Sequence, residues 1–96
     1  MVHRLSELPV GGKGVVAEIS GERSVRRRLM ELGLLPGTGV AVVNIAPLGD
    51  PLELAVRGGR LSIRRAEAAH ITLGEPIELP SRDDSQKSKR KLKVIR

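Results

Sequence analysis

The feature that most limits how this chain can fold is the absence of every aromatic side chain, because its 96 residues include no Phe, Tyr or Trp. A hydrophobic core must then be built from Leu, Val, Ile and Ala, whose small branched side chains suit a narrow barrel. The same absence excludes a nucleic-acid surface on which bases stack on aromatic rings, and an aromatic-lined groove for Pro-rich peptides. Since Cys is also absent, disulfides, thiolate metal sites and cysteine nucleophiles are excluded.

Positive charge is concentrated near the C-terminus. The formal net charge is +6, and residues 81–96 contain seven of the 17 basic and two of the 11 acidic residues, which amounts to +5. We therefore predict a nearly neutral folded domain over residues 1–80 and a basic, disordered tail over residues 81–96. Such a tail either keeps the protein soluble or contacts a phosphate-rich or acidic partner, and both interpretations stay open.

The length and the apolar segments also restrict the class of protein. A chain of 96 residues is long enough for one domain and too short for two separate cores. No segment reaches the roughly 18–20 apolar residues that span a bilayer. Residues 1–10 contain no apolar core of signal-peptide length, because Glu7 and Pro9 interrupt it. We expect a cytoplasmic protein that does not itself span the membrane.

One short helix is predicted between the first two strands. Val25, Leu29 and Leu32 fall at positions i, i+4 and i+7, which places them on one helical face. Ser24 is the predicted N-cap, and Gly33 suits the left-handed position that follows a helix end. About two and a half turns fit between these signals, so this helix requires tertiary packing to persist.

The remaining segments are short, β-branched and separated by turns. The clearest is an alternating pair of strands on either side of Gly58-Gly59, which predicts a β-hairpin turning at these two glycines. About five short strands with closely spaced turns favour a small barrel over an open sheet. The predicted fold is thus mainly β, with one short α-helix after the first strand. The predicted strands are 14–19, 40–46, 52–57, 60–64 and 71–73, with one helical turn at 66–69.

No catalytic group of residues is recognisable, so we expect no enzyme. The two histidines, His3 and His70, lie in no nucleophile motif, and the glycine pairs are not part of a phosphate-binding loop. Glu67 and His70 lie three residues apart and could share a helix face, and a divalent transition ion accepts such ligands. Two ligands are too few for a stable site. We therefore predict no cofactor, with a weak contact to a divalent metal ion left open.

Three consecutive arginines, Arg26 to Arg28, suggest a nucleic-acid contact. On a helix each step turns by about 100°, so the three side chains fan through about 200° and cannot form one flat patch. Arg28 lies beside the apolar face of the helix. We expect its side chain to bond to a nearby loop, with Asp50 as a candidate partner.

Three stretches resemble the signatures of the FeoA family, ferrous iron transport protein A. They are RLMELGLLPG at residues 28–37, APLGDP at 46–51 and RRAEA at 64–68, and the likeness spans Leu5 to Leu73. The resemblance implies an SH3-like barrel in the bacterial cytoplasm, with an accessory role beside FeoB, the G-protein-coupled membrane permease for Fe²⁺. It also links the chain to the C-terminal domain of DtxR-type metal-dependent repressors. The basic tail lies outside the family pattern.

A barrel without catalytic groups must act by contact, and two loops with apolar residues are the candidate contact surfaces. We expect them to bind the cytoplasmic domain of a FeoB-type permease, with no small-molecule substrate and no nucleic acid. The alternatives are a small basic nucleic-acid-binding barrel and a stand-alone metal-responsive domain. For the first loop, a purely structural role as a plug of the barrel end is also open. The candidate residues are Leu34, Leu35, Pro36, Gly37, Pro47, Leu48, Gly49, Asp50 and Pro51.

Overall fold

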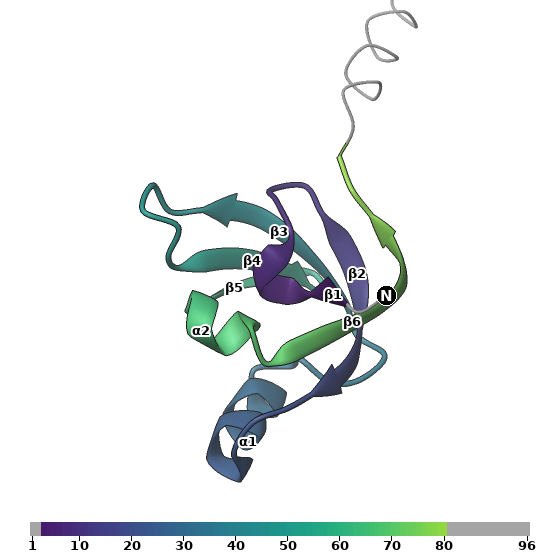
Figure 1. Ribbon diagram of the computed structural model, residues 1–96, viewed down its shortest axis with the longest axis vertical. Helices are drawn as coiled ribbons and strands as arrows, with labels where there is room; N and C mark the ends of the chain where they lie inside the picture. Colours follow the sequence, from purple (N-terminus) through teal and green to yellow (C-terminus); the bar gives the residue numbers. More distant parts are fainter. Residues whose placement is uncertain (1–2, 81–96) are drawn as a thin grey trace, which may run out of the picture.

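A single antiparallel sheet of six strands forms most of the molecule in the computed structural model, which describes residues 3–80 (Figure 1). The strand order is β1-β6-β2-β3-β4-β5. In chain order the elements are β1 (His3–Arg4), the 3-10 helix η1 (Leu5–Glu7), β2 (Lys13–Ile19), α1 (Arg23–Glu31), β3 (Gly39–Ile45), β4 (Leu52–Val56), β5 (Gly59–Ile63), α2 (Arg65–Ala68) and β6 (Ile71–Glu78). Within residues 3–80, no helix is long and apolar enough to cross a membrane.

The predicted mainly β fold, with a short helix after the first predicted strand, is confirmed. The structure has one strand more than predicted, because β1 is only two residues long and leaves no pattern in the sequence. In β1, His3 pairs with Leu73 and Arg4 pairs with Thr72. The last strand is also longer than the predicted 71–73. It pairs with β1 on one side and with β2 on the other, and the pairing with β2 continues to Glu78.

The core is aliphatic, as the absence of aromatic residues predicts. Among the residues whose side chains the structure describes, which are residues 3–74 and 77–80, Thr38 is the one buried polar residue. Leu29 is the buried residue of α1, and Leu34, in the turn after the helix, is buried as well. The buried apolar residues are Leu5, Leu8, Val16, Ile19, Leu29, Leu34, Val40, Val42, Leu52, Leu54, Ile63, Ala68, Ile71 and Leu73.

Two details of α1 differ from the prediction. The helix begins two residues earlier than expected, at Arg23 with Glu22 as its N-cap, so Ser24 lies inside the first turn and is not the N-cap. Leu32 is 38% exposed, so the predicted apolar face is wrong at this position. Leu32 is exposed because the helix has already ended: α1 stops at Glu31. Gly33 then turns the chain with a φ of +101°, as predicted for this glycine.

The β4–β5 hairpin is confirmed, but its turn lies one residue earlier than predicted. Val56 pairs with Gly59, so the turn residues are Arg57 and Gly58 and not the two glycines. Their φ angles are +41° and +79°. Positive values at both positions match the type I′ turn, whose twist suits a two-residue hairpin. Arg57 therefore occupies a backbone conformation that side chains other than glycine adopt at a cost.

Strand β3 separates two ends of the barrel. Its seven residues rise by about 3.3 Å each, so the turn before β3 and the loop after it lie roughly 20 Å apart. Because Ala41 pairs with Ala55, the β4–β5 turn lies at the same end as the start of β3. We call this end, with the C-terminus of α1, the α1 end. Figure 1 shows the described chain leaving β6 on the side of the molecule away from α1.

Candidate docking surface

The structure does not bring the two predicted loops together. Leu34 is fully buried and plugs the barrel, as the alternative interpretation of this loop expects, whereas Leu35 is 47% exposed. The second loop, residues 46–51, lies at the other end of β3 and presents Leu48, which is 96% exposed. The predicted residues therefore form two separate surfaces, each with one strongly exposed leucine.

The loop of residues 46–51 is held from outside by Arg65. The backbone N–H of Arg65 donates to Oδ1 of Asp50 at 2.9 Å, and its Nε donates to the carbonyl oxygen of Gly49 at 2.8 Å. A second guanidinium nitrogen donates to the carbonyl oxygen of Ser6 in η1. One part-buried arginine thus connects the loop, α2 and η1. The predicted bond from Arg28 to Asp50 is not formed, so that prediction is wrong.

Arg28 binds Glu67 instead. Its Nε lies 2.7 Å from Oε2 of Glu67, and the other carboxylate oxygen accepts the backbone N–H of Arg64 at 2.9 Å. Asp50 accepts instead from the backbone N–H of Arg65 through its Oδ1. Glu67 lies on α2, three residues before His70, as the sequence indicates, but both of its oxygens already have partners.

For the possible divalent metal contact at Glu67 and His70, the described residues offer no third ligand. In the described part of the chain, no group of three or more His, Cys, Asp or Glu side chains is arranged to hold a metal ion. The His70 ring lies against Gly21, where a Cβ built on the glycine would stand 2.9 Å from Nδ1. That histidine therefore packs against backbone, and the prediction that the chain carries no cofactor stays a prediction.

A groove at the α1 end is the feature that the sequence did not predict. It has a volume of about 420 Å³ and lies between the C-terminus of α1 and the β4–β5 hairpin. Leu32, Val56 and Leu61 supply its apolar lining, while Arg57 and Glu31 are charged residues of the same groove. Only the fold brings these two segments together. The sequence pattern carried no signal for the groove, because it placed Leu32 on the apolar face of the helix.

The groove combines apolar surface with charged groups of both signs. Leu32 is 38% exposed, and Leu35 follows it in the turn that leads to β3. Arg60 also lines the groove and faces Glu53 with an N–O distance of 3.7 Å. An apolar centre with a polar margin is typical of protein–protein interfaces.

Comparison with known proteins gives a family match over most of the chain. Residues 3–74 match the family model described as the FeoA domain. A curated relative from Porphyromonas gingivalis, the Fe(2+) transport protein A/Fe(2+) transporter FeoB fusion protein, is 38% identical over 68 residues. The matched region covers 71% of this chain and 8% of that relative. The chain thus corresponds to a small part of the fusion protein.

Solved structures show the same fold. A FeoA-like protein from Clostridium acetobutylicum has a TM-score of 0.75 and 35% identity, and the match covers 83% of this chain and 93% of that one. Stenotrophomonas maltophilia FeoA, a prokaryotic SH3 domain protein complexed with zinc, has a TM-score of 0.70 and 31% identity, with coverage of 82% and 99%. The predicted SH3-like barrel is therefore confirmed. A manganese-dependent transcriptional repressor shares the fold alone, at 18% identity and a TM-score of 0.72 over 78% of this chain and 37% of the repressor.

Proposed function

This chain belongs to the FeoA family, and from that premise we propose that it is a non-enzymatic accessory protein of ferrous iron uptake. It acts by binding the cytoplasmic domain of a FeoB-type permease. The observation that carries the proposal is the fusion relative, in which a matching segment and the transporter share one polypeptide. Two domains joined in one chain meet at a high effective concentration, which favours a functional contact between them.

The groove at the α1 end is the surface that we assign to this contact. Its apolar residues, Leu32, Val56 and Leu61, gather in one hollow, and Leu35 adds exposed apolar surface in the adjoining turn. Burial of clustered apolar groups is the main favourable term in protein association. Leu48 is more exposed, but it stands at the tip of a hairpin loop away from this groove. Single exposed leucines are common on proteins and do not by themselves mark an interface.

A binding experiment with matched variants tests the proposal. The full chain is titrated into the isolated cytoplasmic domain of a FeoB-type permease, and the affinity is compared for Leu32→Gln and Leu48→Gln. We expect Leu32→Gln to weaken binding about tenfold, as for a central interface residue, and Leu48→Gln to have little effect. Absence of binding by the unaltered chain would contradict the function. If the two variants changed the affinity equally, the groove would not be the surface that binds the permease domain.

The absence of a resident metal ion is part of the same proposal. The zinc complex of the Stenotrophomonas maltophilia protein does not lead us to place zinc here. The proposal that no metal ion is resident is supported by the contacts of Glu67, because one of its oxygens binds Arg28 and the other accepts the Arg64 N–H. Calorimetry with Fe²⁺ under anaerobic conditions is the test. A stoichiometric binding heat that disappears in His70→Ala would show that this part of the proposal is wrong.

A further inference from the structure

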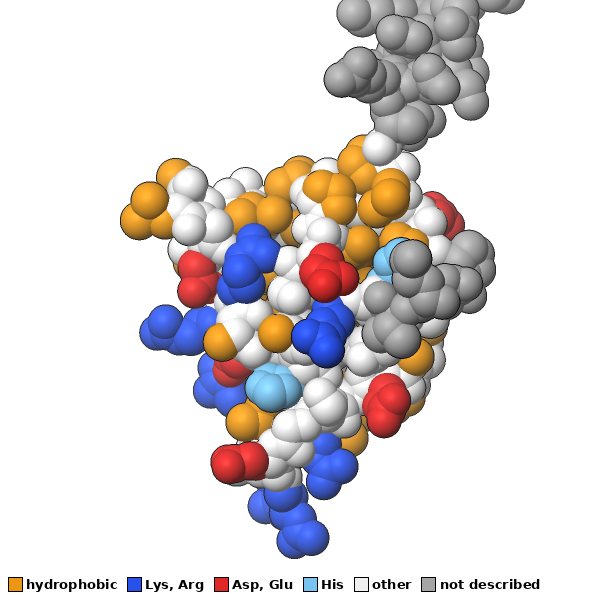
Figure 2. Space-filling model, viewed as in Figure 1, with side chains coloured by type: hydrophobic (Ala, Val, Ile, Leu, Met, Phe, Trp, Pro, Cys, Tyr) orange, Lys and Arg blue, Asp and Glu red, His pale blue; other side chains and the backbone are white. Residues whose placement is uncertain are grey.

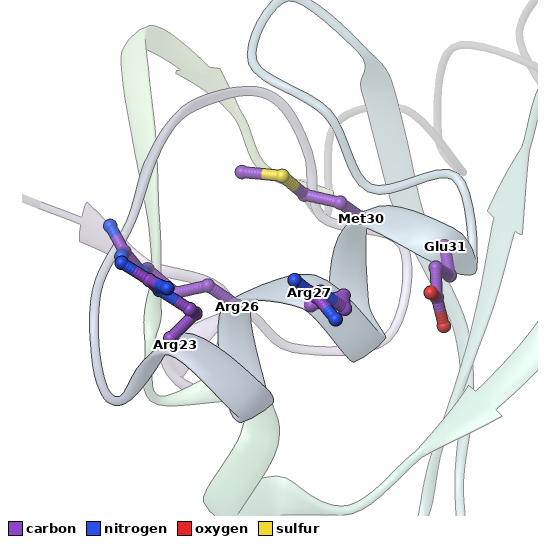
Figure 3. Close-up of a pocket in the computed structure, with 5 residues that line it drawn as sticks. All are labelled: Arg23, Arg26, Arg27, Met30 and Glu31. Atoms are coloured by element: carbon purple, nitrogen blue, oxygen red, sulfur yellow. The ribbon is translucent and has the colours of Figure 1, made fainter.

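Four side chains line the outer face of α1 with helical spacing. Arg23, Arg26, Arg27 and Met30 follow one another at i, i+3, i+4 and i+7, which places them on one side of the helix. All four are exposed, and together with Glu31 they line a shallow hollow of about 470 Å³. Figure 3 shows Arg23 and Arg26 extending in the same direction from the helix. We call Arg23, Arg26, Arg27 and Met30 the arginine face.

The arginine face differs from the run of three arginines that the sequence suggests. Arg28 leaves the face and reaches toward α2, where it binds Glu67. The prediction that Arg26, Arg27 and Arg28 cannot form one patch therefore agrees with this geometry. Arg23, one turn earlier, completes the face in place of Arg28. Figure 2 shows basic side chains at the lower tip of the molecule, where α1 lies, and others on the left and centre of this face.

The charge of this face is not compensated within the described residues. Among residues 3–80, no carboxylate forms an ion pair with Arg23, Arg26 or Arg27, whereas Arg28 and Arg60 each have one. Arg23 opens the first turn of α1, where the helix dipole is positive, and the acidic residue at this end is the N-cap Glu22. Like charges at this spacing also repel one another. An external anionic surface would relieve both effects.

We propose that the arginine face binds the anionic surface of a phospholipid bilayer. Guanidinium groups donate paired hydrogen bonds to phosphate oxygens, and Met30, 39% exposed, supplies an apolar group that enters the headgroup boundary. The face is the outer side of a helix at the tip of the molecule, so it can meet a flat surface (Figure 2). The choice of a membrane rests on the proposed function, since a permease keeps its accessory protein beside a bilayer.

Sedimentation with lipid vesicles tests the charge of the face. The full chain is mixed with vesicles of phosphatidylglycerol and phosphatidylcholine, or of phosphatidylcholine alone. The test variant carries Arg23→Gln, Arg26→Gln and Arg27→Gln together. Each cation near an anionic membrane contributes about fivefold to partitioning, so we expect roughly a 100-fold loss on the anionic vesicles. Far-UV circular dichroism and a thermal melt confirm that the variant is folded.

A control variant removes the same charge elsewhere. Arg4→Gln, Lys13→Gln and Arg64→Gln together lower the net charge equally at three exposed positions outside α1. Both variants keep residues 81–96, so any contribution of that segment is the same in each. We expect the control to bind anionic vesicles nearly as well as the unaltered chain. Equal losses for the two variants would show that net charge alone drives binding, and would overturn the proposal.

A fluorescent reporter tests whether Met30 enters the headgroup region. Because the chain contains no Trp or Tyr, Met30→Trp gives emission from a single site. We expect a blue shift on anionic vesicles for Met30→Trp and none for Leu48→Trp, which places the same reporter on the distant loop. A shift confined to Leu48→Trp, or no shift in either variant, would overturn the proposal.

The remaining outcomes distinguish this proposal from the proposed function. An unaltered chain that binds the permease domain but not anionic vesicles overturns the membrane contact and leaves the accessory role intact. If the triple arginine variant keeps its vesicle binding and loses the permease domain, the arginine face recognises an acidic protein surface instead. Equal loss of binding to anionic vesicles and to duplex DNA would assign the face to polyanions in general, and would also overturn the proposal.

Discussion

The Nε atom of Arg28 in α1 lies 2.7 Å from Oε2 of Glu67 in α2. Since Oε1 of the same carboxylate accepts the N–H of Arg64, Glu67 both caps α2 and ties it to α1. This contact turns Arg28 away from the outer side of α1. It also engages the carboxylate that would otherwise be the first candidate for a metal ligand beside His70.

The two roles of Glu67 can be separated by substitution. Glu67→Gln keeps an oxygen for the Arg64 N–H and loses the ion pair, so we expect a loss of about 0.5 kcal/mol, because Arg28 is 63% exposed. Glu67→Ala loses the cap as well, and we expect about 1.5 kcal/mol in total. Urea denaturation measures both values. Equal losses for Gln and Ala would show that the cap contributes nothing.

Arg65 and Arg64 are neighbours with different structural roles, and they form a matched pair. Arg65→Ala removes the guanidinium bonds to the carbonyl oxygens of Gly49 and Ser6, so we expect a loss of about 2–3 kcal/mol in the free energy of unfolding. Arg64→Ala keeps its backbone N–H bond to Glu67, and we expect less than about 0.5 kcal/mol. Similar losses in denaturant titrations of the two variants would rule out Arg65 as the residue that holds the loop.

Gly21 and Gly33 have the same φ, +101°, but different surroundings. A Cβ at Gly21 would stand 2.9 Å from Nδ1 of His70, whereas a Cβ at Gly33 meets no atom within 4 Å. Gly33→Ala should therefore cost only the backbone strain, about 1–2 kcal/mol. Gly21→Ala should cost more, and the excess should disappear in a His70→Ala background. Thermal melts of the four proteins measure this difference, and an excess that persists without His70 would contradict the contact.

Iron uptake in cells gives a functional comparison of the two exposed loops. Leu35→Asp places a charge in the turn between α1 and β3, three residues after Leu32 of the proposed docking groove, while Leu48→Asp places it on the loop after β3. Both side chains are exposed, so both variants should fold. We expect Leu35→Asp to reduce permease-dependent Fe²⁺ uptake severalfold and Leu48→Asp to leave it unchanged. The reverse order of effects would move the docking surface to the loop of residues 46–51.

Local signals in the sequence were sufficient for much of the fold. The β4–β5 hairpin, the glycine after α1 and the aliphatic core all depend on neighbouring residues, and the structure confirms them. The turn was misplaced because two adjacent glycines suggest a turn at both, whereas Gly59 pairs with Val56 and Arg57 takes the positive φ. The two-residue β1 exists only because β6 offers it an edge.

The candidate sites depended more on the fold than on local patterns. Ser6, Gly49 and Arg65 meet around one guanidinium although they lie far apart in the chain. The groove likewise needs a helix end and a hairpin from separate segments. The arginine face was accessible from the sequence, because Arg23 stands three residues before Arg26. The predicted domain boundary at residue 80 stays a prediction, since residues 81–96 lie outside the described part of the chain.

The departure of the chain from β6 on the side away from α1 has a practical consequence for attachment (Figure 1). The described chain ends on the side of the barrel that lies away from α1, and so away from the docking groove and the arginine face. Immobilisation on a sensor surface through the C-terminus would therefore attach the barrel at a point distant from α1. An N-terminal handle would instead begin beside β6, on the flank of the barrel, and would leave the orientation of α1 uncontrolled.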